Sequence, residues 1–198
     1  LSLLFCFVAA FLSAFLDALT VTAVLIGVGI GFYRIFHLAK SGKNFDDDHN
    51  YLDDSSLDSL GRDQQEQFKS FLRNLLMHGV VGTALGGVCT IVGEPQNLLI
   101  ANVADWTFME FLVVMSPITV PVFFAGMITC FSVEKLKIAG FGTQLPAEIK
   151  EIFASYSDFR TENLTEKDKT DLLIESIVGV LLIIALALHV AEVGLIGL

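Results

Sequence analysis

A carboxylic acid lies deep inside the first apolar run of the sequence. Asp17 stands between Leu16 and Ala18, and no Lys or Arg lies within sixteen positions of it. Because an ionisable group at the centre of a bilayer costs on the order of 2.5–3.5 kcal/mol, such a group is typical of an ion pathway. A carboxyl group in an apolar medium either holds a proton or binds a cation. Asp17 is therefore a candidate for a site where protons and metal cations compete. The alternative is a protonated carboxyl group that hydrogen-bonds a neighbouring helix carbonyl.

A second unusual motif interrupts the next apolar run. Residues 82–97 read Gly-Thr-Ala-Leu-Gly-Gly-Val-Cys-Thr-Ile-Val-Gly-Glu-Pro-Gln-Asn. Pro95 has no amide hydrogen and disfavours helix at Glu94, so we expect the helix to break within residues 86–97. Broken helices persist at membrane depth where the loosened backbone lines a site, and in transporters they supply carbonyl oxygens to Na⁺. The alternative is a small-residue packing face. It explains the glycines, but it does not explain Glu94, Gln96 and Asn97.

Four apolar regions are long enough to cross or enter a bilayer, which takes roughly 20 residues. They are residues 1–36, 75–101, 108–133 and 174–198. A continuous helix over residues 1–36 would extend about 54 Å, whereas the hydrocarbon core is about 30 Å thick. We therefore predict a re-entrant hairpin with Asp17 near its tip. The alternative of a secretory signal peptide fails, because the run is too long and has no basic segment before it.

The distribution of Lys and Arg predicts which side of the membrane each connecting segment faces. All Lys and Arg residues lie in or beside the two polar segments, and residues 102–107 contain none. By the positive-inside rule the polar segments face the cytoplasm and residues 102–107 face outward. The chain then divides into a hairpin, an acidic cytoplasmic segment, two crossings with a break at 86–97, a second cytoplasmic segment and a final span. Their bounds are 1–36, 37–74, 75–133, 134–172 and 173–198. The predicted fold class is an all-α polytopic membrane protein.

The polar segments carry helical patterns and no metal motif. The acidic run Asp46–Asp48 lacks the glycine and the closing glutamate of a calcium-binding EF-hand, so a solvated linker is the better interpretation. Two apolar stripes have helical spacing. They are Phe68, Phe71, Leu72 and Leu75, which lead into the membrane, and Ile149, Ile152, Phe153 and Tyr156, which predict an amphipathic helix. Thr165 and Asp168 predict a variant capping box before the last span.

The composition excludes several classes of protein. The 198 residues are 54% hydrophobic and only 17% charged, which is unlike a soluble enzyme, and the net charge of −10 argues against binding nucleic acid. Cys6, Cys89 and Cys130 lie in apolar runs, and their odd number favours apolar fillers over disulfides or a metal site. The sequence starts at Leu1 and ends within an apolar run. We expect it to be an internal fragment of a larger membrane protein.

Residues 11–21 and 86–97 together resemble the NhaB family of bacterial sodium/proton antiporters, and the similarity continues to the end of the chain. The resemblance implies that the chain is less than half of a family member. The wider ion-transporter superfamily, which includes dicarboxylate/sodium symporters, is similar at the same two places. There a hairpin tip and an unwound loop meet near mid-membrane and coordinate Na⁺. The resemblance places Leu16, Asp17 and Ala18 at the tip. It also implies an inverted repeat, with the second copy beyond Leu198.

The resemblance implies a Na⁺ (Li⁺)/H⁺ antiporter of the bacterial inner membrane, with membrane lipid and the missing second half of the protein as partners and no cofactor. The candidate ion-binding residues are Asp17, Thr20, Gly86, Gly87, Thr90, Gly93, Glu94 and Asn97. Asp17 is expected to bind Na⁺ with hydroxyl and backbone carbonyl oxygens. Glu94 is the candidate second titrating group.

Three alternatives remain. A sodium-coupled anion symporter would need basic or hydroxyl-rich anion contacts, and here Asp17, Glu94 and Gln96 replace neutral residues of the symporter pattern. An intramembrane enzyme would need a second acid or a nucleophile with a base; only Glu94 is available, and no Gly-x-Gly-Asp motif occurs. A purely structural subunit explains neither Asp17 nor the broken helix. The sequence assigns no role to His78 or Glu192.

Overall fold

The computed structural model describes residues 1–42, 44, 59–143 and 145–187. The described residues form α-helices and one short 3₁₀ helix. They are α1 (Ser2–Ser13), α2 (Ala18–Lys40), α3 (Ser59–Gly87), α4 (Pro95–Ala104), α5 (Phe108–Leu136), η2 (Ile138–Gly140), α6 (Ala147–Glu162) and α7 (Glu166–Ala187). Within the described residues, α2 and α5 are long and apolar enough to span a membrane. The predicted all-α class is confirmed.

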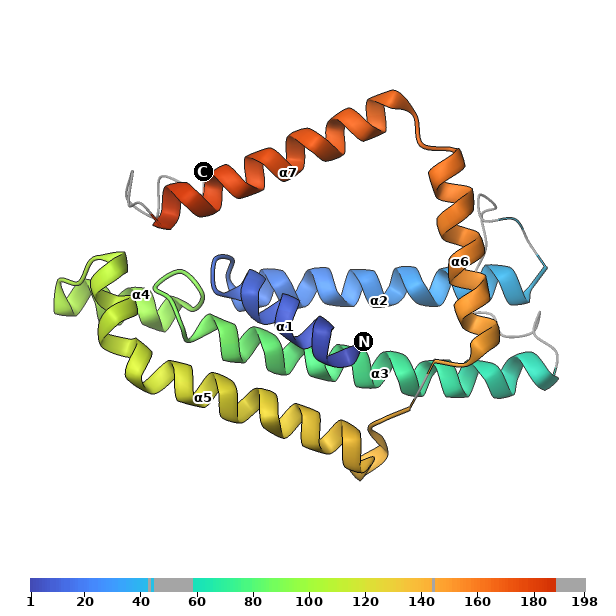
Figure 1. Cartoon of the computed structure of the whole chain (residues 1–198), viewed down its shortest axis with the longest axis horizontal. Helices are drawn as coiled ribbons and strands as arrows, with labels where there is room; N and C mark the ends of the chain where they lie inside the picture. The colour runs from blue at the N-terminus through green and yellow to red at the C-terminus, as the bar shows by residue number, and fades with distance from the viewer. Residues whose placement is uncertain (43, 45–58, 144, 188–198) are drawn as a thin grey trace.

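The first two helices reverse the direction of the chain. α1 ends at Ser13, residues 14–17 form a turn, and α2 runs back in the opposite direction (Figure 1). The packing partner of α1 is α3, which approaches so closely that Gly82 faces the backbone of Cys6 and Gly86 faces the backbone of Ala10. A Cβ atom at either glycine would overlap a carbonyl oxygen of α1. Small residues at such positions allow two helices to touch backbone to backbone.

The apolar region that begins near residue 75 is interrupted. α3 runs from the polar segment into the apolar region and ends at Gly87, and α4 begins at Pro95. The non-helical residues 88–94 lie inside the range where Pro95 predicts a break. Pro is favoured at the first position of a helix, where its missing amide hydrogen costs nothing. After a left-handed residue at Asp105, α5 starts with a capping box between Thr107 and Glu110.

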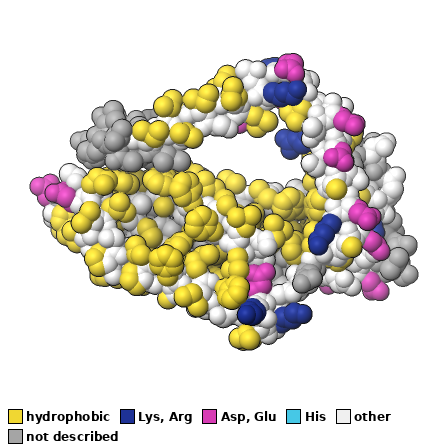
Figure 2. Space-filling model, in the orientation of Figure 1, with side chains coloured by type: hydrophobic (Ala, Val, Ile, Leu, Met, Phe, Trp, Pro, Cys, Tyr) yellow, Lys and Arg dark blue, Asp and Glu magenta, His cyan; other side chains and the backbone are white. Residues whose placement is uncertain are grey.

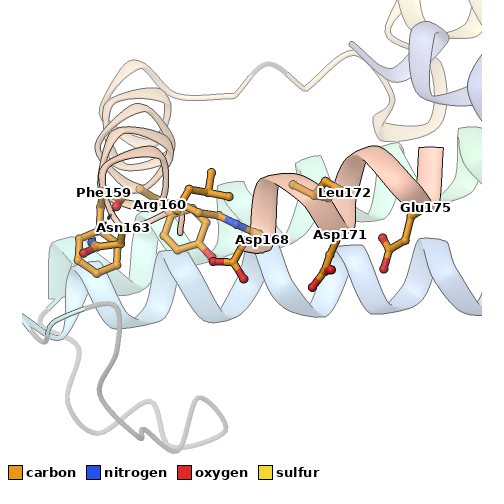
Figure 3. Close-up of a pocket in the computed structure, with 9 residues that line it drawn as sticks. Phe159, Arg160, Asn163, Asp168, Asp171, Leu172 and Glu175 are labelled. Atoms are coloured by element: carbon orange, nitrogen blue, oxygen red, sulfur yellow. Dashed lines mark hydrogen bonds between the residues drawn. The ribbon is translucent and has the colours of Figure 1, made fainter. Parts of the chain in front are cut away.

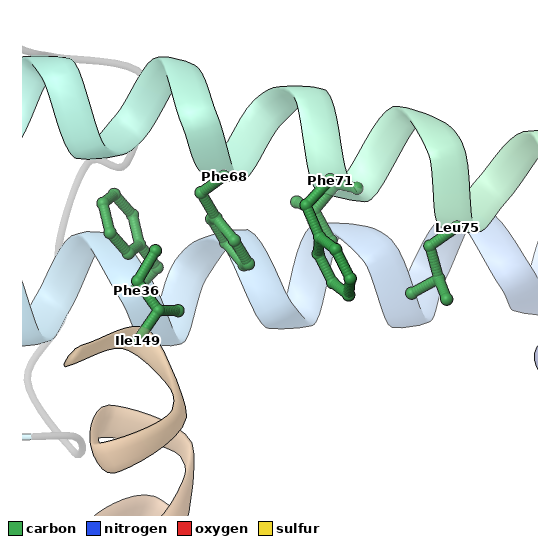
Figure 4. Packing of buried hydrophobic residues seen from close by; sticks show 6 residues of the cluster. Phe36, Phe68, Phe71, Leu75 and Ile149 are labelled. Atoms are coloured by element: carbon green, nitrogen blue, oxygen red, sulfur yellow. The ribbon is translucent and has the colours of Figure 1, made fainter. Parts of the chain in front are cut away.

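An aromatic cluster lies at the end of α2 that is far from the turn at residues 14–17. Both apolar stripes of the sequence meet there, in a cluster shared by α2, α3 and α6 (Figure 4). Its buried members are Phe36, Phe68, Phe71, Leu72, Leu75 and Ile149. Ile152 and Phe153 pack against it. The apolar side of α6 thus docks on the helical bundle.

The surface is apolar along the bundle and charged at the end where α6 lies (Figure 2). Large hydrophobic side chains of α5 and α7 are widely exposed, such as Val113 (65%) and Leu173 (61%). Exposed apolar surface on this scale is typical of helices that face lipid or another helix. Lys40 ends α2, and Lys135 and Lys137 end α5, so the positive-inside rule predicts that this end faces the cytoplasm.

Helix α7 begins beside a cavity of about 450 Å³ between α6 and α7, which Arg160, Asp168, Asp171 and Glu175 help to line (Figure 3). The predicted capping box is confirmed: the Thr165 amide and hydroxyl donate to Asp168 Oδ2 at 3.0 and 2.7 Å, and the Asp168 amide donates back at 3.2 Å. The acidic run Asp46–Asp48, Glu192 and the last part of the predicted span 173–198 lie outside the described residues.

This cap should depend on pH. Hydrogen bonds from Thr165, and to a smaller extent the charge of Arg160, hold the pKa of the Asp168 carboxyl below its usual value. A lowered pKa means that the cap is fully formed above the ordinary aspartate pKa of about 3.9 and is lost as pH falls through the lowered value. Amide hydrogen exchange, corrected for the intrinsic rate, should show the first turn of α7 losing protection over that range.

Two threonine variants test the role of Thr165 in this cap. Thr165→Ala should weaken this pH dependence, because the Asp168 carboxylate then loses the hydroxyl donor and keeps only the backbone amide of residue 165. Thr161→Ala should keep it, because the Thr161 hydroxyl donates to the Ser157 carbonyl instead. Equal pH dependence in both variants would contradict the assignment.

Candidate functional site

The two motifs singled out in the sequence touch each other. The amide of Ala18, the first residue of α2, donates to the Gly93 carbonyl oxygen at 3.2 Å. The Thr90 hydroxyl donates to the Ala14 carbonyl oxygen in the turn before α2. The turn at residues 14–17 and the interruption at residues 88–94 therefore form one continuous non-helical region, although they are some seventy residues apart in sequence.

Asp17 begins α2 as its N-cap. Asp17 Oδ1 accepts the amide hydrogen of Thr20 at 2.9 Å, and Oδ2 accepts the Thr20 hydroxyl hydrogen. Aspartate is a favoured N-cap, because its oxygen satisfies an amide that has no partner inside the helix. The helix dipole also favours a negative charge at this end. The sequence interpretation weighed a proton, a cation or a helix carbonyl as the partner of Asp17. It missed the N-terminus of α2, which the pattern Asp-Ala-Leu-Thr before an apolar helix indicates.

Asn97 holds the interruption together from within α4. Its side-chain amide donates to the Gly87 carbonyl at 2.9 Å and to the Thr90 carbonyl at 2.8 Å. The Gly93 amide donates to the Thr90 hydroxyl at 3.3 Å. Asn97 is only 7% exposed, so these bonds are shielded from water. One side chain of α4 thus satisfies the last carbonyl of α3 and a carbonyl inside the break, as buried backbone groups require.

The glycines of the motif allow close approach. At Gly93 an added Cβ would lie 2.7 Å from the Ser13 carbonyl oxygen and would overlap the Gly87 carbonyl. At Gly87 it would lie 3.1 Å from the Glu94 Cγ. The packing alternative weighed in the sequence therefore describes Gly82 and Gly86, which lie against α1, whereas Gly87 and Gly93 lie within the interruption itself.

The chemistry available here is that of oxygen donors. Glu94 precedes α4 without a side-chain capping bond. Among the described residues, no hydrogen bond links the Asp17 carboxylate to Thr90, Glu94 or Asn97, and no three His, Cys, Asp or Glu side chains cluster as a metal site would need. A cation at this place would be bound by a carboxylate, hydroxyl groups and backbone carbonyls, which suits a hard ion.

Sequence reasoning missed further polar contacts around this region. The Ser13 hydroxyl donates to the Thr83 carbonyl at 2.8 Å, and the hydroxyls of Thr22 and Thr83 lie 3.5 Å apart. These contacts join α1, α2 and α3 beside the turn. Hydroxyl residues inside apolar runs were the available signal. Also on α3, buried His78 lies 3.7 Å from the Glu134 carboxylate of α5.

Removing the Asn97 side chain should loosen the interruption. Asn97→Ala leaves two buried carbonyls without donors, and one such group costs about 1–3 kcal/mol. We expect the amides of residues 88–98 to exchange about tenfold faster or more in the full-length protein. Asn102→Ala, at an exposed position of the same helix, should leave them unchanged. An equal response to both variants would show that Asn97 does not hold the break.

Comparison with known proteins places the chain in a family. A family model described as "Bacterial Na+/H+ antiporter B (NhaB)" matches residues 1–198. A protein named "Na(+)/H(+) antiporter NhaB" from Shewanella halifaxensis is 58% identical over 197 residues, covering 100% of this chain and 37% of the relative. Proteins of that name from Saccharophagus degradans and Vibrio atlanticus are 54% and 53% identical over 198 residues, again 100% of this chain, and 40% and 37% of their own length.

The chain thus spans less than half the length of these curated relatives. No solved structure matches it. The resemblance inferred from residues 11–21 and 86–97 is confirmed over the whole sequence. The chain belongs to the bacterial Na⁺/H⁺ antiporter B (NhaB) family.

Proposed function

We propose that this chain is part of a secondary transporter that exchanges Na⁺ or Li⁺ for H⁺ across the bacterial inner membrane. The observation that carries the proposal is the contact between the turn at Asp17 and the interruption at residues 88–94. It brings a carboxylate-bearing helix start to a stretch of backbone outside any helix. Family membership and the names of the relatives support the same function.

The proposed ion site uses oxygen atoms from both segments. The Asp17 carboxylate supplies the charge, the hydroxyls of Thr20 and Thr90 supply neutral donors, and carbonyls of residues 86–93 complete the shell. Interrupted membrane helices coordinate Na⁺ in this way in other transporters. Gly87, Gly93 and Asn97 shape the loop, and Gly86 sets its distance from α1. In this proposal α1 and α2 form a re-entrant hairpin, and an inverted repeat in the rest of the protein supplies the second half of the pathway.

Exchange follows from competition for Asp17. A carboxylate that binds Na⁺ cannot hold a proton at the same oxygen, so each ion displaces the other. Na⁺ binds from the cytoplasm, alternating access opens the site outward, and external protons then displace Na⁺ and return inward. The site contains no cluster of basic residues among the described part of the chain, so an anionic co-substrate has no evident partner there.

The test is ion-driven proton movement by the full-length protein. Everted membrane vesicles are first given an acid interior, and Na⁺ or Li⁺ is then added while a pH-sensitive dye is recorded. We expect both ions to dissipate the pH gradient, and choline at the same concentration to have no effect. If neither Na⁺ nor Li⁺ moves protons in vesicles that contain the protein, antiport is wrong and anion symport becomes the leading function.

Glu94 is proposed as a second titrating group, which would help the antiporter move more protons than cations. Glu94→Gln should then shift the pH dependence of exchange without abolishing it. Glu110→Gln is the matched control, because glutamine also forms a capping box and Glu110 is exposed. Full transport with an unchanged pH profile in Glu94→Gln would remove Glu94 from the mechanism.

A further inference from the structure

Three sulfur atoms from two helices meet away from the proposed Na⁺ site. The Cys6 thiol of α1 donates to the Met127 sulfur of α5 at 3.6 Å. The Cys130 thiol lies one turn along α5 from Met127 and interacts electrostatically with the Cys6 thiol. Cys6 is 0% exposed and Cys130 is 8% exposed, and both are free thiols. From the sequence these cysteines were interpreted as separate apolar fillers; the fold brings two of them together with a thioether.

The three side chains are held in place by their helices. Met127 and Cys130 are three residues apart on α5, so they lie on the same face. Cys6 is fixed opposite them because its own backbone rests on Gly82 of α3. An apolar cavity of about 180 Å³ reaches Cys130 between α3 and α5, and Met77, His78 and Phe141 help to line it. The three side chains are thus held in place, and the cavity gives a small species a route to Cys130.

We propose that Cys6, Met127 and Cys130 form a binding site for a soft monovalent cation such as Cu(I) or Ag(I). Thiolate and thioether sulfur are the ligands that select such ions. A trigonal site with metal–sulfur bonds of about 2.3 Å needs sulfur atoms about 4 Å apart, close to the 3.6 Å between Cys6 and Met127. Na⁺, which takes oxygen ligands, is not a candidate for this site.

The charge balance suits an apolar interior. When the cation binds, one S–H bond breaks and its proton leaves to the buffer. Three sulfur–metal bonds form, one from the thiolate and two from lone pairs of the neutral thiol and the thioether. No electron is transferred. The thiolate and the cation neutralise each other, and the second thiol and the thioether are neutral ligands. A buried site is costly when it carries net charge, so a single positive ion fits this donor set better than a divalent one.

The site can be tested by Cu(I) titration of the full-length protein in detergent without oxygen, with bicinchoninate as the competing coloured chelator. We expect the wild-type protein to bind one Cu(I) more per chain than either Cys6→Ser or Met127→Leu. Met127→Leu conserves side-chain volume and so keeps the helices packed. Cys89→Ser is the matched control, because the Cys89 thiol donates to the Leu85 carbonyl at 3.2 Å and lies outside the sulfur cluster.

X-ray absorption of the loaded protein provides a second readout. We expect only sulfur neighbours around copper in the wild type, and fewer of them in Met127→Leu. Equal Cu(I) stoichiometry in the wild type, Cys6→Ser and Met127→Leu would overturn the proposal and return these residues to apolar packing. So would loss of the ion from Cys89→Ser alone. Neither readout depends on whether the protein exchanges Na⁺ for H⁺.

Discussion

Asp17→Asn in the full-length protein is expected to abolish Na⁺-dependent proton movement while membrane levels stay normal. Asparagine is as good an N-cap as aspartate, so α2 keeps its start. The variant removes the charge and leaves the helix cap. A contact to a charged group is worth about 1.5–3 kcal/mol. Since about 1.4 kcal/mol is a factor of ten, ion binding should weaken about tenfold or more.

The matched control is the same substitution at a different turn. Asp105 is exposed and adopts a left-handed conformation with φ of 55° at the end of α4. Asparagine tolerates that conformation, so Asp105→Asn should exchange ions as the parent does. The measurement is the dye response of everted vesicles across a range of Na⁺ concentrations. Wild-type exchange by Asp17→Asn would leave antiport standing, but Asp17 would then act only as the cap of α2.

Gly86→Ala should lower the free energy of unfolding more than a glycine-to-alanine substitution at any other position discussed here. The new Cβ would overlap the Ala10 carbonyl oxygen. The clash is with the backbone of α1, so no side-chain rotation can relieve it. Overpacking costs about 1–3 kcal/mol when side chains can adjust, occasionally more. Here a whole helix must move, so we expect about 3 kcal/mol or more. α1 leads directly into the turn at Asp17, so displacing it would disturb the ion site as well.

Gly27→Ala is the opposite case. Nothing lies within 4 Å of a Cβ at Gly27, which is an interior residue of α2. Alanine is favoured over glycine by about 0.5–1 kcal/mol in a helix interior, so this variant should be slightly more stable. The measurement is the melting midpoint of each purified full-length variant, with size-exclusion chromatography as the readout of folded protein. Similar midpoints for Gly86→Ala and Gly27→Ala would contradict the close contact between α1 and α3.

Local chemistry explains what the sequence predicted well. Pro95 disfavours helix at the residue before it, so the interruption at residues 88–94 could be predicted from neighbouring residues in the chain. The stripe from Phe68 to Leu75 follows helical periodicity and is buried on that side. The box of Thr165 and Asp168 involves residues three apart. In each case the determining residues are neighbours in the chain.

Contacts between distant segments could not be read in this way. The Ser13–Thr83 bond joins residues 70 apart, and the Cys6–Met127 contact joins residues 121 apart. Their positions depend on how α1 lies between α3 and α5. Sequence alone also left two interpretations of the glycines open. The fold separates them: Gly82 and Gly86 allow the middle of α1 to pack closely, whereas Gly93 lies in the interruption and contacts Gly87 and the Ser13 carbonyl.

The bond between Ala18 and Gly93 places the beginnings of α2 and α4 next to each other. Each helix start is equivalent to roughly half a positive elementary charge. A cation placed between them is repelled unless an ionised carboxylate offsets the two dipoles. Protonation of Asp17 would remove that countercharge and leave the dipoles to expel Na⁺. Proton uptake and sodium release would then be one electrostatic event, driven by the direction of two helices and requiring no displacement of the carboxylate itself.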